Sequence, residues 1–423
     1  MADKLFTSRR EFLAGGVTFL SAASTLPVFL GRTATALASM EPRAKKRDDA
    51  PILVVVQLAG GNDGLNTIVP VEMDEYYRAR PRLAIKKANT LALKDGVALP
   101  SECDGLKGLF DEGRMAVIQG VGYPNPNRSH FVSMDVWHTA DPDLKAHNGW
   151  LGRYFDSCCN GADPSPSDGV AIMSEAPLAM QGEKFMPLSF ESPDALRWRS
   201  GERDKAAAET FRKLNNLDGD KPLIEAADED DLASYLQRAA LQAQVGADEI
   251  RSAAGDLGSG RFNRRTGGLG RSLQMVARLI AADLPTRIYY VSMGGFDTHT
   301  GQEGRHRNLM TEFSSAMKAF IDQLAEDKLL ERVVVMSFSE FGRRVEENSS
   351  GGTDHGEAAP MFLFGSRIAP GLHGKHPSLT NLHRGDLEFG VDFRRVYAGV
   401  LRDWLKQKPE QIIGRQAPLR LIA

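Results

Sequence analysis

The stretch PILVVVQL, Pro51 to Leu58, is a continuous apolar run rich in valine. Such a run is typical of a strand that is buried on both faces, as in a parallel sheet covered by helices. Similar short runs recur at residues 115–120, 287–293, 332–338 and 361–365. The pattern therefore predicts an α/β fold with a mostly parallel sheet.

A long segment with helical spacing lies between the third and fourth of these runs, at residues 305–330. Its apolar residues recur every three or four positions, so they share one side of a helix. A strand, a helix and a strand in that order form the unit of a doubly wound sheet flanked by helices. The predicted apolar stripe consists of Leu309, Phe313, Met317, Phe320, Ile321 and Leu324.

The N-terminal stretch, residues 1–38, has the layout of an export signal. Ser8–Leu13 reads SRREFL, an apolar segment follows, and Ala36–Ala38 resembles the small-residue cleavage site that ends such signals. We expect a twin-arginine signal, the twin-arginine translocase as a partner, and a periplasmic or extracellular product. A basic membrane anchor that is retained is the alternative. Residues 39–50 form a charged linker.

The remaining chain, residues 51–423, is predicted to be one α/β domain. Residues 160–268 are rich in Ala, Asp and Glu around their centre, so we expect a helical insertion or cap there. The chain closes with an amphipathic helix whose apolar stripe is Val396, Val400, Leu401 and Trp404.

Composition excludes several classes of partner. The 52 Lys and Arg residues against 55 Asp and Glu give no basic excess, so nothing points to nucleic acid. No run after the signal approaches the roughly 18 apolar residues of a membrane span, so no stable span is expected after cleavage. The three cysteines form no disulfide framework, although one bridge from Cys103 stays open as an alternative.

Each apolar run is next to an unusual polar loop. In parallel sheets, ligands bind beyond the carboxyl ends of the strands, so loops that are distant in sequence converge there. Carboxylates and imidazoles together suit a divalent metal such as zinc, manganese, magnesium or calcium. The loop residues are Asp63 after the first run; Arg128, Ser129 and His130 after the second; Asp297 and His299 after the third; Glu340 and Arg343 after the fourth; and Asp354 and His355 before the fifth.

Each residue also has a structural interpretation when it is taken alone. Asp63 sits in a glycine-rich turn and is of a type that forms turns, and Glu340 can pair with a neighbouring arginine. Ser129 precedes a predicted helix, where a hydroxyl is either an N-cap or a nucleophile beside an anion-binding helix end. Arg128, His130 and Arg343 are candidates for binding an anionic substrate. Three further histidines are expected at the surface: His138, His147 and His306.

Four motifs together resemble the bacterial domain of unknown function 1501 family, within the alkaline phosphatase and sulfatase superfamily. They are LAGGNDGLNTIVP, NRSHF, GGFDTH and SEFGRR followed by GGTDHG. The resemblance implies hydrolysis of phosphate or sulfate esters with one or two divalent metals. It implies that Asp63 is a metal ligand, that Ser129 is the nucleophile, and that Asp297 and His299 are a metal-binding pair.

The chain departs from that pattern after the fourth run. The resemblance places Asp-His-Gly there, whereas this chain has Glu340-Phe341-Gly342 and carries Asp354-His355-Gly356 later. Either the late pair replaces the lost ligand or one of two metal sites is weakened. Glu340 then serves as a further ligand or a base, and Asp354 and His355 complete the predicted metal set. His373, His376 and His383 are alternative sources of a ligand.

The expected function is therefore an exported, metal-dependent hydrolase of phosphate or sulfate esters. A catalytically degenerate protein on the same scaffold, which binds an anionic glycan or an export partner, is the alternative. A redox role is a third reading, although no haem, iron–sulfur or dinucleotide motif accompanies it.

Overall fold

The structure is a computed structural model, and it describes residues 50–158, 166–192, 250 and 261–422. The expected signal over residues 1–38 and nearly all of the linker over 39–50 lie outside the described residues. Among the residues that are described, no helix has both the length and the apolar character needed to cross a membrane.

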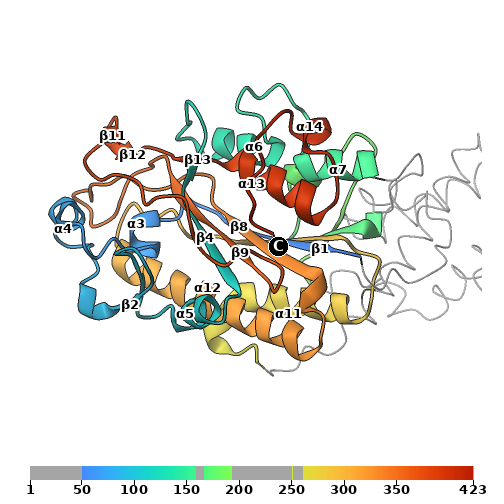
Figure 1. The fold of residues 1–423 in the computed structure, drawn as a ribbon, viewed down its shortest axis with the longest axis horizontal. Helices are drawn as coiled ribbons and strands as arrows, with labels where there is room; N and C mark the ends of the chain where they lie inside the picture. The colour runs from blue at the N-terminus through green and yellow to red at the C-terminus, as the bar shows by residue number, and fades with distance from the viewer. Residues whose placement is uncertain (1–49, 159–165, 193–249, 251–260, 423) are drawn as a thin grey trace, which may run out of the picture.

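The centre of the molecule is a sheet (Figure 1), and all but one of the strands that the structure describes in it run in the same direction. The exception is β9 (Ala359–Phe364), which is antiparallel to both of its neighbours. The strand order along the sheet is β10 (Gly371–His373), β4 (Met115–Gly122), β9, β8 (Val333–Phe338), β1 (Ile52–Leu58), β7 (Ile288–Met293), β5 (Gly169–Ile172) and β6 (Leu188–Ser189), with β13 (Val391–Asp392) beside β4.

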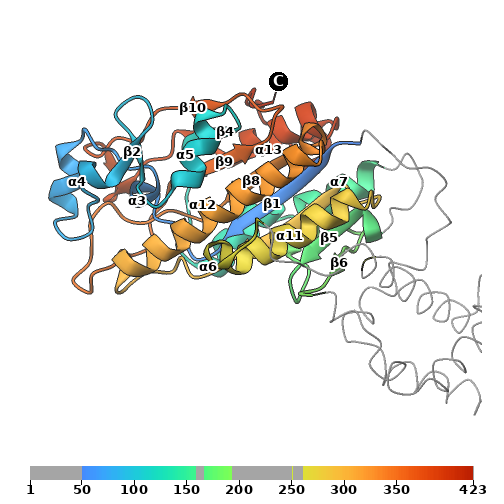
Figure 2. The ribbon, with the colours of Figure 1, turned by 90° about the horizontal axis from the view of Figure 1, so that it is seen from below.

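Successive side chains of β1 point to opposite faces of the sheet, and each face has its own core. Ile52, Val54, Val56 and Leu58 pack into one core, whereas Leu53 and Val55 pack into the other. Helices cover both faces, as Figures 1 and 2 show. The first face carries α5 (Asp104–Asp111), α11 (Gly267–Ala281) and α12 (Gln302–Glu326), and the second carries α6 (His130–Thr139), α7 (Trp150–Cys158) and α13 (Phe393–Gly399).

This architecture confirms the predicted doubly wound, mostly parallel α/β sheet. All five predicted strands are present as β1, β4, β7, β8 and β9. The predicted long helix is α12, and its stripe is buried except for Leu309, which is partly exposed. The predicted C-terminal stripe is also buried, although the α-helix changes to a π-helix over Val400–Trp404.

Two expectations need correction. Residues 169–172 and 188–189, inside the expected helical insertion, are strands β5 and β6 of the central sheet, because they add in parallel beside β7. Their four and two residues are too short for a clear periodic signal, and the centre of the expected insertion, residues 193–249, lies outside the described residues. Cys103 is a free, fully buried thiol rather than half of a bridge.

Candidate metal centre

The connection from β8 to the antiparallel strand β9, residues 339–358, lies at the ligand-binding edge of the sheet. Strands β1, β4, β7 and β8 are parallel, so the loops that follow them meet at their shared carboxyl edge. Because β9 runs the other way, the loop that precedes it lies at that same edge. His130, Asp297 and His355 therefore meet, although 225 positions separate the first from the last.

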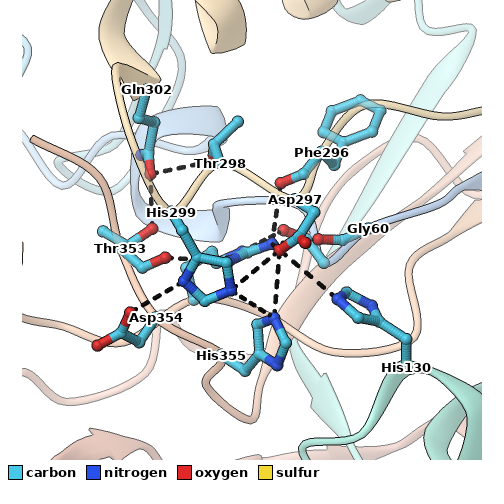
Figure 3. Close-up of polar contacts among 12 residues, drawn as sticks. Gly60, His130, Phe296, Asp297, Thr298, His299, Gln302, Thr353, Asp354 and His355 are labelled. Carbon is cyan, nitrogen blue, oxygen red and sulfur yellow. Dashed lines mark hydrogen bonds and ion pairs between the residues drawn. The ribbon is translucent and has the colours of Figure 1, made fainter. Parts of the chain in front are cut away.

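Asp297 lies at the centre of a group of three imidazole rings (Figure 3). Its Oδ1 atom is 3.2 Å from Nε2 of His299, 3.2 Å from Nε2 of His355 and 3.5 Å from Nε2 of His130. The Nε2 atoms of His299 and His355 are 2.9 Å apart. One carboxylate oxygen and three ring nitrogens thus converge on one small volume.

The outward-facing nitrogen of each ring contacts a group that accepts hydrogen bonds. Nδ1 of His130 lies 2.8 Å from Oε1 of Glu340. Nδ1 of His299 lies 2.9 Å from Oδ1 of Asp354, and Nδ1 of His355 lies 2.7 Å from the backbone oxygen of Arg128. Because these oxygens accept, the proton of each ring is on Nδ1 and the lone pair of Nε2 faces the centre. Metal-binding histidines in proteins are held in this way.

Burial and neighbouring charges shift the pKa values of the central groups. Burial raises the pKa of Asp297, but the hydrogen bond and charge of Arg343, together with His355 and His299, outweigh it and bring that pKa down to about 2. Burial lowers the pKa of His355, which favours the neutral ring. The hydrogen bond to Glu340 raises the pKa of His130. The carboxylates of Asp297, Asp354 and Glu340 outnumber the single guanidinium of Arg343 among the groups in contact.

A divalent ion fits this arrangement. His130, Asp297 and His355 can each place one ligand atom within 4.8 Å of the other two. Nε2 of His130 is buried, and within the described part of the chain it has no hydrogen-bond partner. A buried nitrogen without a partner, aimed at a carboxylate and two other lone pairs, is the arrangement that a bound cation satisfies.

Arg343 holds the centre together and is not available to bind an anion. Its side chain is fully buried, and Nη2 donates to Oδ1 of Asp297 at 2.7 Å. Its other contacts are to the backbone oxygens of Gly60, Gly61, Phe296 and Thr353. The predicted role of Arg343 in substrate binding is therefore corrected, because its buried guanidinium already donates to Asp297 and to backbone oxygens.

Glu340 is buried beside the centre and contacts His130. Its side chain is 2% exposed, and its Oε1 accepts from the backbone N–H of Gly60 at 2.8 Å as well as from His130. Gly60 has a φ of +118°, and a Cβ there would collide with the backbone of Asp297. Only glycine fits between the two loops. The carboxylate is thus enclosed between His130 and the backbone of Gly60.

Asp63 does not face the metal centre. It is the N-cap of α3 (Gly64–Thr67), and its carboxylate accepts from Nη1 of Arg80 at 2.9 and 2.7 Å and from the side chain of Gln302. The side chains of Asp63 and Arg80 are both 0% exposed. Burial raises the pKa of Asp63, but the charge of Arg80, the neighbouring His306 and the hydrogen bonds from Arg80 and Gln302 together outweigh it, so that pKa is lowered. Arg80 is therefore the cation that pairs with this predicted metal ligand.

Phe341 packs under the centre in place of the expected histidine. Its ring centroid is 4.8 Å from that of His130 and 4.7 Å from that of His355, and Phe341 is 1% exposed. Ser129 is exposed at the N-terminus of α6, directly before His130, and its side chain does not cap the helix. Arg128 is partly exposed, and it pairs with Asp386.

The remaining histidines lie elsewhere. His138 and His306 are buried rather than at the surface, because each fills a core position and has a hydrogen-bonding contact with a buried side chain. His147 is exposed, as predicted. The three alternative ligands, His373, His376 and His383, contact Ala369, Pro377 and Glu357 and not the centre.

The sequence predicts that His130 binds substrate, whereas the structure places it in the group of imidazoles around Asp297. The signal was present, because His130 follows the second predicted strand as His299 follows the third. No signal marked Arg80, which lies in an ordinary amphipathic segment 17 positions from its partner Asp63.

The fold and site define an α/β protein with a candidate mononuclear centre at the carboxyl edge of its sheet. A family model described as "Protein of unknown function (DUF1501)" matches residues 116–405, so the chain belongs to that family. This confirms the resemblance seen in the sequence. No curated protein matches the chain.

Several solved structures are similar to this chain, all at low identity. The C-terminal periplasmic domain of EcEptC from Escherichia coli, in complex with Zn, has 9% identity and a TM-score of 0.35, with 76% of this chain and 75% of that chain covered. The lipoteichoic acid synthase LtaP from Listeria monocytogenes has 9% identity and a TM-score of 0.35, with 92% and 82% covered. The PsFucS1 sulfatase from Pseudoalteromonas sp. has 10% identity and a TM-score of 0.33, with 85% and 68% covered.

Proposed function

We propose that this protein is a metal-dependent hydrolase of phosphate or sulfate esters. The observation that carries the proposal is the convergence of three imidazole Nε2 atoms on Oδ1 of Asp297. A divalent ion there would polarise an ester oxygen and offset the negative charge that develops during hydrolysis. His130, Asp297, His299 and His355 would hold it.

The donor set narrows the choice of metal. Three nitrogens and one oxygen suit zinc, manganese or iron, whereas magnesium and calcium prefer oxygen ligands. We therefore favour zinc or manganese over magnesium and calcium. Asp354, which was a predicted ligand, instead lies behind His299 and accepts from its Nδ1. The centre as proposed holds one ion, because Asp63 is already neutralised by Arg80.

Ser129 is the proposed nucleophile. Its neighbour His130 is one of the proposed ligands, and the hydroxyl is exposed at the start of α6. The first N–H groups of a helix and the positive end of its dipole favour an anion at that position. A phosphate or sulfate ester would therefore meet the hydroxyl and the helix end together. Arg128, partly exposed in the same loop, remains the candidate arginine for the anion.

Metal analysis and turnover test this proposal together. Purified protein should contain close to one zinc or manganese ion per chain and should hydrolyse aryl phosphates or aryl sulfates. Ser129→Ala should keep the metal and lose at least about 10³-fold in kcat. Ser272→Ala, on α11 and remote from the centre, serves as the matched control. Protein that binds no metal and turns over neither ester class would refute the proposal.

A binding protein on the same scaffold is the second candidate. The observation that favours it is the loss of two expected metal positions, since Phe341 cannot ligate and Asp63 is paired with Arg80. Such a protein would bind an anionic glycan or an export partner without hydrolysis. Ser129→Ala would then keep the thermal stabilisation that the ligand produces in the wild type, and no ester would be turned over by either protein.

Export through the twin-arginine translocase is part of the proposal. The SRREFL stretch at Ser8–Leu13 supports it. A double variant, Arg9→Lys with Arg10→Lys, should leave the protein in the cytoplasm, whereas the native sequence should deliver it to the periplasm or beyond. Equal distribution of the two proteins in a cell fractionation would contradict this export route.

A further inference from the structure

Asp386 is a fully buried carboxylate held by two arginines from two different loops at the metal-centre edge. It lies in β12 (Asp386–Leu387), which pairs with β11 (Leu382–His383), and its side chain is 0% exposed. The guanidinium of Arg128 contacts Oδ2, and Nε of Arg344 donates to Oδ1 at 3.2 Å. A longer contact, 3.7 Å, joins Arg128 to Glu357.

The backbone groups of the same two arginines form hydrogen-bonding contacts with the segment that carries His355. The carbonyl oxygen of Arg128 lies 2.7 Å from Nδ1 of His355. The N–H of Arg344 donates to the carbonyl of Asp354, the residue before His355, at 3.0 Å. Asp386 therefore ties together the two backbone groups that position one proposed ligand.

We propose that Asp386 is a positioning residue for His355 and acts through Arg128. This inference rests on the proposed metal centre. With the carboxylate in place, Arg128 is anchored, and its carbonyl keeps the His355 proton on Nδ1 and the Nε2 lone pair toward Asp297. Without it, the half-exposed Arg128 side chain loses its buried anchor, and the carbonyl no longer fixes the ring. Removal of such an outer partner of a metal-binding histidine typically weakens metal binding by about 10- to 100-fold.

Zinc titration of the full chain tests this by a double-mutant cycle. Asp386→Asn keeps the shape of the side chain and removes its charge, so it should weaken zinc binding by about 10- to 100-fold. Arg128→Met should weaken it to a similar extent. If Asp386 acts through Arg128, Asp386→Asn should change the affinity less than about 3-fold in the Arg128→Met background. Equal weakening in both backgrounds, or none in the wild-type background, would overturn the proposal.

The matched control is Asp283→Asn, which breaks a half-buried carboxylate–arginine pair with Arg332 at 3.1 Å, near the opposite end of β8. It should leave zinc affinity unchanged. Thermal unfolding of each variant identifies proteins that are not folded. Should Asp386→Asn fail to fold, the Arg128→Met protein alone still has to show the weakened affinity.

A readout without metal separates this inference from the proposed function. In metal-free protein labelled with ¹⁵N-histidine, the wild-type spectrum should show His355 with its proton on Nδ1, and Asp386→Asn should show a mixture of the two tautomers. If the wild type binds no zinc, the proposed function fails while this spectrum still tests the positioning. An unchanged His355 tautomer in Asp386→Asn would overturn the positioning itself.

Discussion

Nε2 of His299 lies 2.9 Å from Nε2 of His355, and each ring contacts an oxygen acceptor through its other nitrogen. If both rings are neutral, two lone pairs face each other at hydrogen-bond distance, which is repulsive. A proton or a metal ion must therefore lie between them. Three carboxylates and one guanidinium surround the rings, and this leaves two negative charges that a divalent ion balances.

The first prediction concerns His130, whose Nε2 completes the ring of donors. His130→Ala should remove one ligand and weaken zinc binding by at least about 10-fold, measured by competition with a chelating dye. His147→Ala is the matched control, since His147 is exposed and is not one of the clustered ligand residues. Equal zinc affinity in the two variants would show that His130 is not a ligand.

The second prediction concerns Glu340, which accepts from both His130 and Gly60. Glu340→Gln keeps the shape of the side chain but removes the charge that stabilises the Nδ1–H of His130. We expect zinc affinity to fall by about 10- to 100-fold. At saturating zinc, each protein molecule with a bound ion should keep most of its activity. If Glu340 were instead the catalytic base, kcat at saturating zinc would collapse while the affinity for zinc stayed the same.

The strands and the edge of the sheet were predictable because both follow from local patterns. A continuous apolar run such as Pro51–Leu58 can only be buried on both faces, and loops after parallel strands share an edge whatever their distance in sequence. Those two facts were enough to predict that the loops of Asp297 and His299 share an edge with the loop that follows β8. The antiparallel direction of β9 keeps the far end of that loop, which carries His355, at the same edge.

The partners inside the site were not predictable, because they depend on three-dimensional contacts between unremarkable residues. Asp63 follows β1 as a ligand would, yet the nearest cation is the guanidinium of Arg80. Arg343 lies in a loop that suits anion binding, yet folding turns its side chain inward onto Asp297 and four backbone oxygens. In both cases the residue type suits the expected chemistry, but the side chain is buried and paired with other groups of the protein.

The third prediction follows from the buried pair of Asp63 and Arg80. Arg80→Met leaves a carboxylate without its partner in a site that is closed to water, so we expect about 3–5 kcal/mol of destabilisation. Asp63→Asn, which removes the charge from the acceptor, should also destabilise the fold but should keep the metal content of the protein. Urea unfolding measures the first effect and elemental analysis the second. Loss of the metal in Asp63→Asn would restore Asp63 as a ligand.

The last prediction concerns His138, which is buried on the face of the sheet opposite α12. Burial lowers the pKa of His138 to about 3, and its Nε2 is 3.2 Å from the hydroxyl of Tyr290. An unfolded histidine has a pKa near 6.5, so between these values the unfolded chain binds a proton that the folded chain refuses. Stability is therefore complete above about pH 6.5 and falls as the pH decreases below it.

Measurements above pH 5 separate the contribution of His138 to the loss of stability from the titration of carboxylates. From pH 6.5 to pH 5, protonation of His138 in the unfolded chain alone should lower the free energy of unfolding by about 1.6 kcal/mol. His138→Gln keeps a donor for Tyr290 and cannot titrate, so its loss over the same interval should be smaller by that amount. His306, whose pKa burial lowers to about 4, should still contribute in both proteins. Identical pH dependence of the urea midpoints would mean that the folded protein accommodates a proton on His138, in conflict with its fully enclosed position.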